Sequence, residues 1–349
     1  MSAQRILISI PNWVGDAVMA TPALMAIRRR FPQARIVHLM RPYVSDVLSG
    51  AGLADEVMFW PDRGHPGAPR GMLSLLKRIR RERFDLGVLL TNSFRSAMTV
   101  RLGGVGRRVG YARDGRSWLL TERLAPHRRN GHFVPTPALD YYNEIARSLG
   151  CEDIGDQMVL ATSAADEAVI DRRLAEGGEG SPLVVLNPGA NYGAAKCWPP
   201  EHYARLADGL RDRFGARVVA SLSPKERWIA ERLKATIRRP MEIFIDPPLG
   251  LGPLKALIRR CRLLITNDTG PRHFAAAFGV PVITIFGSSD PAWTETRYAK
   301  ERIVKLQLDC QPCMERTCPL KHHRCMKDLS ADMVLEKVDE FLLQTAQRC

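Results

Sequence analysis

Apolar runs of strand length alternate with amphipathic stretches in the first half of the chain. The runs Arg5–Ile10, Arg35–Met40 and Leu86–Thr91 have the length and composition of buried strands. Between them, Ala17–Arg30 and Met72–Arg83 carry apolar residues at helical spacing. Strands that alternate with helices are typical of a doubly wound parallel sheet, so we expect an α/β fold.

The same alternation begins again after Gly177–Pro182, a stretch with the composition of a linker. The expected elements are strands at 183–186, 217–222, 263–266 and 280–286, and helices at 202–213, 225–237, 254–260 and 331–344. The Arg- and Gly-rich residues 107–135 are expected to form loops. We predict two tandem α/β domains, 1–176 and 177–328, and a segment 329–349 whose helix packs back on the first domain. Ligands of such domains bind at the carboxyl ends of the strands and in the cleft between the two halves.

The positive charge is concentrated in the first domain. The 349 residues carry a formal net charge of +14, and residues 1–150 alone hold 23 Lys and Arg against 11 Asp and Glu. Such a basic half indicates an anionic partner, either nucleic acid, an anionic membrane surface or a phosphorylated substrate. A single basic run such as Arg28–Arg30 is also compatible with a solvated helix face.

The start of the chain shows no targeting segment. Met1–Arg5 leads directly into the first apolar run, without the basic region, long apolar core and cleavage site of a signal peptide. No apolar run reaches the roughly 18 residues of a membrane span. Eight cysteines in 349 residues do not indicate a secreted disulfide scaffold. We therefore expect a cytoplasmic protein.

The most informative polar stretch follows the apolar run Cys261–Ile265 and continues to His273. An alanine-rich segment comes next and ends at Gly279, so a strand, a tight turn and a helix are expected. Asp268 and Thr269 are good helix-capping residues, and Gly270 permits the close approach of a ligand. A helix N-terminus attracts anions such as a diphosphate, although an ordinary capped helix accounts for the same residues.

Two further turns could carry chemistry. Asp16 follows the first strand at the start of a helix, where it is either a helix-capping acid or a general base at the mouth of the cleft. Pro188–Lys196 follows the first strand of the second domain, and Lys196 offers a positive charge to phosphate, although the ending of a Walker loop is absent. Glu226 begins another helix and could bind ribose hydroxyls or be an ordinary first-turn acid.

Sixteen residues near the end of the chain contain the cysteines Cys310, Cys313, Cys318 and Cys325. Two histidines, His322 and His323, lie in the last interval. The first pair of cysteines has the spacing of a zinc half-site, whereas the spacing of the second pair is unusual. The alternatives are a structural zinc site, an iron–sulfur cluster, reduced thiols, or a disulfide formed in air.

Five motifs show which family this chain resembles. They are N-W-V-G-D at 12–16, N-S-F-R-S-A at 92–97, P-G-A…K-x-W-P at 188–199, S-P-K-E at 223–226 and N-D-T-G-P-x-H at 267–273. Each motif is weak alone, but in this order and spacing they resemble the bacterial lipopolysaccharide (LPS) heptosyltransferases, glycosyltransferase family 9. The first two look most like the members that add the second heptose of the inner core.

The resemblance implies a GT-B fold, in which two Rossmann-like domains face a central cleft. The first domain would bind the acceptor, lipid A–Kdo2–heptose, and the second would bind ADP-heptose. The family inverts the configuration of the sugar and requires no metal or other cofactor. The acceptor's phosphates and acidic sugars would suit the basic first domain, which would place the protein on the cytoplasmic face of the inner membrane, with no nucleic acid as partner.

The family's functional positions carry over onto single residues of this chain. Asp16 falls on the catalytic base, Lys196 on the lysine that contacts the donor phosphates, and Glu226 on the acid near the donor ribose. The remaining donor positions fall on Asp268, Thr269, Gly270 and His273, and on Asn191 and Tyr192 of the donor loop. In the basic half, the candidate acceptor contacts are Arg63, Lys77, Arg95 and Arg113.

Three other interpretations remain open. Within the family, a type I or type III enzyme would act on a different core acceptor. A nucleic-acid-binding protein would account for the basic half, but the chain shows no nucleic-acid-binding motif and no clustered aromatic residues among its basic runs. A metal-sensing α/β protein would account for the cysteine cluster alone.

Overall fold

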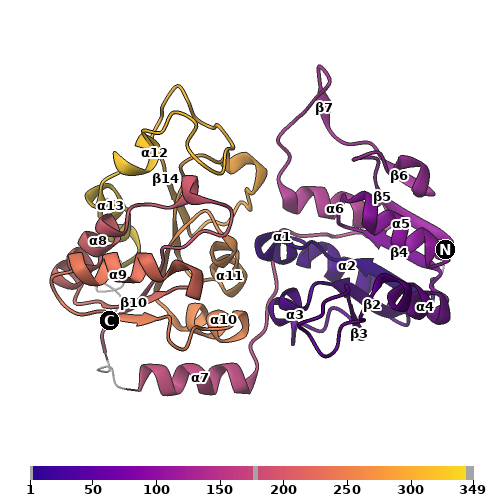
Figure 1. Cartoon of the computed structure of the whole chain (residues 1–349), viewed down its shortest axis with the longest axis horizontal. Helices are drawn as coiled ribbons and strands as arrows, with labels where there is room; N and C mark the ends of the chain where they lie inside the picture. Colours follow the sequence, from indigo (N-terminus) through magenta and orange to yellow (C-terminus); the bar gives the residue numbers. More distant parts are fainter. Residues whose placement is uncertain (1–2, 176–179, 343–349) are drawn as a thin grey trace. The chain divides into compact units, whose positions relative to one another are not determined.

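The computed structural model describes residues 3–175 and 180–342, and the chain folds into two compact units. The first unit comprises Met1–Ala161 with Ala292–Thr296, and the second comprises Thr162–Pro291 with Arg297–Cys349. Each unit contains one six-stranded parallel sheet with helices around it (Figure 1). The predicted α/β class and the two Rossmann-like domains are confirmed.

The sheet of the first unit has the strand order β3-β2-β1-β4-β5-β6. Its strands are β1 (Arg5–Ser9), β2 (Arg35–Met40), β3 (Glu56–Phe59), β4 (Leu86–Leu89), β5 (Arg107–Tyr111) and β6 (Glu122–Leu124). The other elements are α1 (Val14–Met19), α2 (Thr21–Arg30), α3 (Pro42–Leu48), α4 (Met72–Glu82), α5 (Phe94–Leu102), the 3-10 helix η1 (Ser117–Leu119), the antiparallel pair β7 (Arg128–Arg129) and β8 (His132–Phe133), and α6 (Ala138–Ser148).

Apolar side chains cover both faces of this sheet. Leu7 of β1 belongs to a core with side chains of α4 and α5, such as Leu75 and Val100. Ile6 and Ile8, which alternate with Leu7 along the strand, are also fully buried. A parallel strand that is buried on both faces reads as a continuous apolar run, which explains why the sequence pattern identified β1 correctly.

The sheet of the second unit repeats this topology in the order β11-β10-β9-β12-β13-β14. Its strands are β9 (Leu183–Asn187), β10 (Arg217–Ser221), β11 (Glu242–Phe244), β12 (Leu263–Asn267), β13 (Val282–Ile285) and β14 (Glu301–Val304). Its helices are α7 (Ala164–Leu174), α8 (Pro200–Phe214), α9 (Arg227–Thr236), α10 (Leu251–Arg260), α11 (Gly270–Phe278), α12 (Arg324–Lys327) and α13 (Ala331–Leu342), with the 3-10 turns η2 (Ala194–Lys196) and η3 (Pro224–Glu226). A further 3-10 turn, η4 (Pro291–Trp293), spans the boundary between the units.

The domain limits differ from those that composition suggested. The units divide at Ala161/Thr162, so α7 belongs to the second unit, where Glu167 forms ion pairs of 2.8 and 2.5 Å with Arg259 and Arg260 of α10. The predicted boundary at 176/177 adjoins residues 176–179, which lie outside the described residues. A glycine-rich stretch reports local composition, whereas the unit boundary depends on which helix packs on which sheet.

The C-terminal helix also packs differently from the prediction. We expected it to pack on the first domain. Instead, Val334, Leu335 and Val338 of α13 are buried in the same core as side chains of α8 and α9. The amphipathic pattern predicted the helix correctly, but it carried no information on the surface that receives its apolar face.

Residues 107–135 contain strands where loops were expected. Val109 and Tyr111 are fully buried in β5, while the flanking Arg107 pairs with Glu122 of β6 at 2.7 Å. The apolar residues Val109 and Tyr111 alternate as in a strand, but the arginines before them make this short pattern hard to recognise in the sequence.

No helix in the described part of the chain is long and apolar enough to cross a membrane.

The strand order determines which loops meet. In each sheet the chain winds first in one direction and then in the other, so that β1 adjoins β4 and β9 adjoins β12. Ligands of such sheets bind at the carboxyl ends of these two central strands. The 12–16 and 92–97 motifs follow β1 and β4, and the 188–199 and 267–273 motifs end or follow β9 and β12. The fold therefore places four of the five motifs in two pairs, one in each unit, and the 223–226 motif follows β10 of the second unit.

Candidate functional site

The second unit brings Lys196 into contact with Asp268. Lys196 ends the turn η2 after β9, and its Nζ forms an ion pair with the carboxylate of Asp268, which follows β12. The side chains are only 13% and 6% exposed, so the pair is largely shielded from water. The same Nζ lies 4.7 Å from the centre of the Tyr192 ring, a distance that allows a cation–π interaction. These contacts hold a positive charge at the carboxyl ends of the two central strands.

Two further groups hold the Asp268 carboxylate. The Nη1 atom of Arg272 lies 3.2 Å from Oδ1, and the Ser289 hydroxyl donates a 2.7 Å hydrogen bond to Oδ2. Burial alone would raise the pKa of Asp268, but the charges of Lys196 and Arg272 and the hydrogen bonds outweigh it and lower this pKa. Asp268 is therefore an anion that keeps the two cations in place.

A largely buried acid, Glu301, balances Arg272 in turn. The guanidinium contacts Glu301 through Nε at 2.9 Å and Nη2 at 3.0 Å, and Thr284 donates a 2.6 Å hydrogen bond to the same carboxylate. Arg272 was not among the residues predicted from the sequence, although its position four residues after Asp268 at the start of a helix is a detectable signal. Ser289 and Glu301 lie far along the chain and give no local signal.

The start of α11 has no side-chain cap. Thr269 is the N-cap residue, but its side chain makes no capping hydrogen bond, so the predicted cap does not form. Its hydroxyl instead accepts a 3.2 Å hydrogen bond from Asn187 Nδ2 at the end of β9. Gly270 is the first helical residue and carries no side chain that could cover this end. The helix dipole favours an anion at such a position, next to Lys196.

His273 is buried on the first turns of α11. Its Nδ1 atom has no hydrogen-bond partner among the described residues. Burial, and then the neighbouring charge of Arg272, lower its pKa well below the ordinary value. The imidazole is therefore neutral, and Nδ1 is available either to donate or to accept a hydrogen bond, depending on the tautomer.

Buried neutral histidines make the stability depend on pH. In the first unit, burial lowers the pKa of His38 to about 3, whereas an unfolded histidine titrates near pH 6.5. The unfolded state therefore binds a proton below about pH 6.5 that the folded state excludes, so stability is lost as the pH falls through this range. We expect urea unfolding between about pH 6.5 and 4 to show a slope smaller by about 1.4 kcal/mol per pH unit in His38→Leu than in the wild type. An equal slope in both proteins would show that His38 is protonated in the fold.

Glu226 lies against the loop after β9. Its Oε2 atom accepts hydrogen bonds of 2.8 Å from both the backbone N–H and the hydroxyl of Ser223. A Cβ atom at Gly189 would overlap the same carboxylate, which would then have to move away. The sequence placed Glu226 at the start of a helix, and the structure places it at the end of η3, bordering the loop that carries Lys196.

The other two donor-loop candidates differ in their surroundings. Asn191 is exposed, whereas Tyr192 is partly buried and its hydroxyl donates a 2.7 Å hydrogen bond to the Met314 carbonyl. Tyr192 thus joins the Lys196 loop to residues 308–323, the cysteine-rich segment.

In the first unit, Asp16 lies in α1 after β1 and is partly buried. The Tyr142 hydroxyl donates a 2.8 Å hydrogen bond to its Oδ1 atom. Tyr142 is buried, and its pKa is raised by burial and by the Asp16 charge, so it remains a donor. Tyr142 could not be found from the sequence, because 126 residues separate it from Asp16.

The 92–97 motif supplies a neighbouring polar group. The Oδ1 atom of Asn92 accepts hydrogen bonds from the Tyr141 hydroxyl at 2.9 Å and from Arg116 Nη2 at 3.1 Å. Arg116 is fully buried, and burial lowers its pKa to about 10, so it stays charged at neutral pH. Asn92 is thus held at the end of β4 by two partners from distant segments.

The four basic acceptor candidates lie on different segments of the first unit. Arg63, Lys77 and Arg95 are exposed, and Arg113 is partly buried. The guanidinium of Arg95 stacks over the Trp60 ring at 5.2 Å, and that of Arg113 over the Phe133 ring at 3.8 Å. Arg95 and Arg113 are therefore held more firmly than Arg63 and Lys77, because an aromatic face restricts the motion of a guanidinium.

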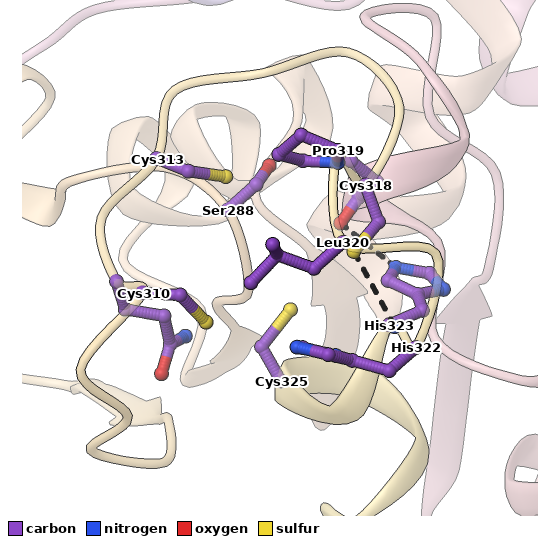
Figure 2. Close-up of a pocket in the computed structure, with 11 residues that line it drawn as sticks. Ser288, Cys310, Cys313, Cys318, Pro319, Leu320, His322, His323 and Cys325 are labelled. Carbon is purple, nitrogen blue, oxygen red and sulfur yellow. Dashed lines mark hydrogen bonds between the residues drawn. The ribbon is translucent and has the colours of Figure 1, made fainter.

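The four clustered cysteines line one cavity of about 20 Å³, together with His322 and His323 (Figure 2). Within residues 3–175 and 180–342, however, no group of three or more His, Cys, Asp or Glu is arranged to hold a metal ion, and the cysteines are unpaired. Several potential ligands have other partners. His323 Nε2 donates to the Ala195 carbonyl at 3.1 Å, His322 Nδ1 accepts from Arg324 N–H at 3.0 Å, and Cys318 Sγ accepts from His323 N–H at 3.4 Å. The structure therefore does not support the zinc or iron–sulfur alternative.

Comparison with known proteins agrees with this arrangement. The profile of glycosyltransferase family 9 (heptosyltransferase) matches residues 72–324. Lipopolysaccharide heptosyltransferase 2 of Escherichia coli K12 is 28% identical over 97% of this chain and 99% of its own. Lipooligosaccharide heptosyltransferase 2 of Campylobacter jejuni is 27% identical over 97% and 98%. The solved structure of E. coli ADP-heptose LPS heptosyltransferase II, a GT-B fold, aligns with a TM-score of 0.80 and 25% identity over 98% of this chain and all of that one. The chain therefore belongs to glycosyltransferase family 9, the heptosyltransferases.

Proposed function

We propose that this protein is an ADP-heptose:LPS heptosyltransferase II, which transfers L-glycero-D-manno-heptose from ADP-heptose to the first heptose of the LPS inner core. The observation that carries the proposal is the largely buried Lys196–Asp268 ion pair beside the uncapped start of α11. Relatives named heptosyltransferase 2 support the choice of type, because they align along nearly the whole chain.

The second unit holds groups suited to a diphosphate leaving group. When the bond to the anomeric carbon breaks, negative charge develops on the phosphate, and Lys196 and the N-terminus of α11 are positive groups that can stabilise it. Lys196 exchanges the Asp268 carboxylate for the phosphate, while Arg272 and Ser289 keep Asp268 balanced. His273 Nδ1 and the backbone at Thr269 and Gly270 contact the diphosphate and the heptose, and Glu226 binds the ribose.

The first unit supplies the general base. An acceptor hydroxyl attacks the anomeric carbon from the side opposite to ADP, which inverts the configuration, and its proton passes to Asp16. The hydrogen bond from Tyr142 orients the Asp16 carboxylate. No step in this mechanism is assigned to a metal ion, and we expect full activity in the presence of EDTA.

The acceptor accounts for the basic first unit. Its phosphates and acidic sugars would be attracted to the excess of Lys and Arg within residues 1–150, and Arg63, Lys77, Arg95 and Arg113 are the candidate contacts. We propose that the enzyme acts in the cytoplasm at the inner face of the inner membrane, where anionic lipids strengthen its contact with the surface.

A matched set of acceptors tests the proposed function. With ADP-heptose as donor and EDTA present, we expect transfer to lipid A–Kdo2–heptose and no transfer to lipid A–Kdo2. Mass spectrometry of the product would show one added heptose, and NMR of its anomeric proton would show the inverted configuration.

The reverse preference would identify a type I enzyme, and transfer only to a longer core would identify type III. ADP-heptose binding without transfer to any of these acceptors would show that the acceptor is misassigned. If ADP-heptose does not bind, the proposed donor site is wrong. Membership of a glycosyltransferase family makes sugar transfer, rather than nucleic-acid binding or metal sensing, the activity to measure first.

A further inference from the structure

The cysteine-rich segment supports the loop that carries Lys196. Residues 308–323 contain no helix or strand, so their position depends on individual contacts. The Ala195 N–H donates a 3.0 Å hydrogen bond to the Arg316 carbonyl, and the Ala195 carbonyl accepts one of 3.1 Å from His323. The Tyr192 hydroxyl bonds to Met314 at 2.7 Å. The loop is therefore held on both sides of Gly193 by this one segment.

The same segment also reaches the partner of Lys196. Met314 N–H donates a 2.8 Å hydrogen bond to the Ser288 carbonyl, and Gln311 Nε2 donates one of 2.6 Å to the Gly287 carbonyl. Ser289, which directly follows Ser288, donates a 2.7 Å hydrogen bond from its hydroxyl to the Asp268 carboxylate. The cysteine-rich segment thus contacts the residues that precede both Lys196 and Ser289. A shift of this segment would therefore affect the Lys196–Asp268 ion pair through Lys196 itself and through Ser289, the partner of Asp268.

The cavity within this segment has room for the sulfur atoms to move. Figure 2 shows the side chains of Cys310, Cys313, Cys318 and Cys325 directed toward the same space, with Ser288 at its edge. The cavity measures about 20 Å³, roughly the space of one water molecule. Two buried polar atoms of its lining, Ser288 Oγ and Gln311 Oε1, have no hydrogen-bond partner among the described residues. The lining is therefore neither tightly packed nor fully hydrogen-bonded.

The four thiols differ in accessibility. Cys325 is buried at the start of α12, whereas the other three are partly exposed. Burial, and then the neighbouring cysteines with Cys313 first, raise the pKa of Cys325 to about 11. A buried, protonated thiol is a poor first nucleophile but can complete a disulfide once a neighbour has been oxidised.

We propose that this cysteine pocket is an oxidation site for peroxides, at which a disulfide between Cys325 and one of the three partly exposed cysteines displaces the Lys196 loop and lowers donor binding. The effect on donor binding rests on the proposed function of Lys196, whereas the disulfide and the loop displacement do not.

The chemistry balances with hydrogen peroxide as the oxidant. A thiolate of Cys310, Cys313 or Cys318 attacks one peroxide oxygen, the O–O bond breaks, and a sulfenic acid and water form. The Cys325 sulfur then attacks the sulfenic sulfur, the S–O bond breaks, and a second water leaves with the thiol proton. Two thiols have lost two electrons in total to the peroxide, and dithiothreitol reverses the reaction by thiol–disulfide exchange.

The geometry explains why this bond would displace the loop. A disulfide holds its two sulfur atoms about 2.05 Å apart, so forming one with Cys325 would draw the cysteine-rich segment toward α12. A Cβ atom at Gly193 would overlap the Arg316 backbone. The Lys196 loop and the cysteine-rich segment are therefore already in close contact and cannot move independently. A displacement of about 1 Å at a catalytic group typically costs about 10²-fold in rate.

The experiment compares the reduced and the peroxide-treated full-length enzyme, with EDTA present throughout. Cys349 lies outside the described residues, so the starting protein carries Cys349→Ser to remove that thiol from exchange. The test variant is Cys325→Ser, and the control is Cys151→Ser, which removes a buried thiol of the first unit. The readouts are disulfide mapping by mass spectrometry, hydrogen exchange of the peptide 188–199, and the affinity for ADP-heptose.

After peroxide treatment we expect a disulfide that includes Cys325, faster exchange in peptide 188–199, and donor affinity lowered by about 10-fold or more, all restored by dithiothreitol. Cys151→Ser should respond like the starting protein, whereas Cys325→Ser should bind donor normally and show no reversible loss. A disulfide without Cys325, an unchanged exchange rate in the oxidised protein, or equal inhibition of Cys325→Ser would each overturn the proposal. If the reduced enzyme binds no ADP-heptose, the proposed function fails, and the disulfide map and the exchange rates still decide the oxidation site.

Discussion

Replacing Asp16 by asparagine is expected to lower kcat by about 10²–10⁴-fold, the usual contribution of a general base. Asparagine has nearly the same shape and can still accept the hydrogen bond from Tyr142, so the surroundings of α1 should be preserved. It cannot take the proton of the acceptor hydroxyl. Because the proposed donor contacts belong to the second unit, the KM for ADP-heptose should change little. Steady-state kinetics with saturating acceptor would separate the two parameters.

Two companion variants sharpen this measurement. Tyr142→Phe removes only the orienting hydrogen bond, whose net value of about 1 kcal/mol corresponds to about a five-fold loss of kcat. Asp153→Asn removes an exposed carboxylate from a loop position with positive φ, a conformation that asparagine tolerates, and should leave kcat unchanged. If Asp16→Asn keeps wild-type kcat while Asp153→Asn behaves as expected, Asp16 is not the base.

Replacing Lys196 by methionine is expected to lower kcat/KM for ADP-heptose by about 10²–10³-fold, the typical effect of losing one electrostatic group at a site of developing charge. Methionine keeps most of the length of the side chain but has no charge to offer the diphosphate. Asp268 would retain Arg272 and Ser289 as partners, so the fold should survive. Initial rates over a range of donor concentrations give the ratio, and circular dichroism checks the fold.

The matched control is Lys234→Met, which removes an exposed lysine from α9 of the same unit. It should have wild-type kinetics. Lys196→Arg should recover part of the loss, because a guanidinium restores the charge but not the compact geometry of an ammonium. Equal kcat/KM values in Lys196→Met and the wild type would rule out the proposed role of Lys196 in stabilising the leaving group.

Patterns among consecutive residues determined much of this protein. Alternating strands and helices predicted two α/β domains, and apolar runs such as Arg5–Ile10 identified central strands, because a parallel strand buried on both faces is apolar throughout. Turn chemistry identified Lys196, Glu226 and Asp268, since small and polar residues after a strand are a local signal. Asp16 was found in the same way, and the functional roles of all four residues remain predictions.

Only the tertiary structure decided how these residues are partnered. Lys196 and Asp268 are 72 residues apart, and Asp16 and Tyr142 are 126 apart, so their contacts depend on which strands lie next to each other. The same reason explains why α13 packs on α8, and why the cysteines surround a cavity behind the Lys196 loop. Local sequence sets the conformation of a segment, whereas the partner of a buried charge or an apolar face is set by strand order and packing, to which residues far apart in the chain contribute.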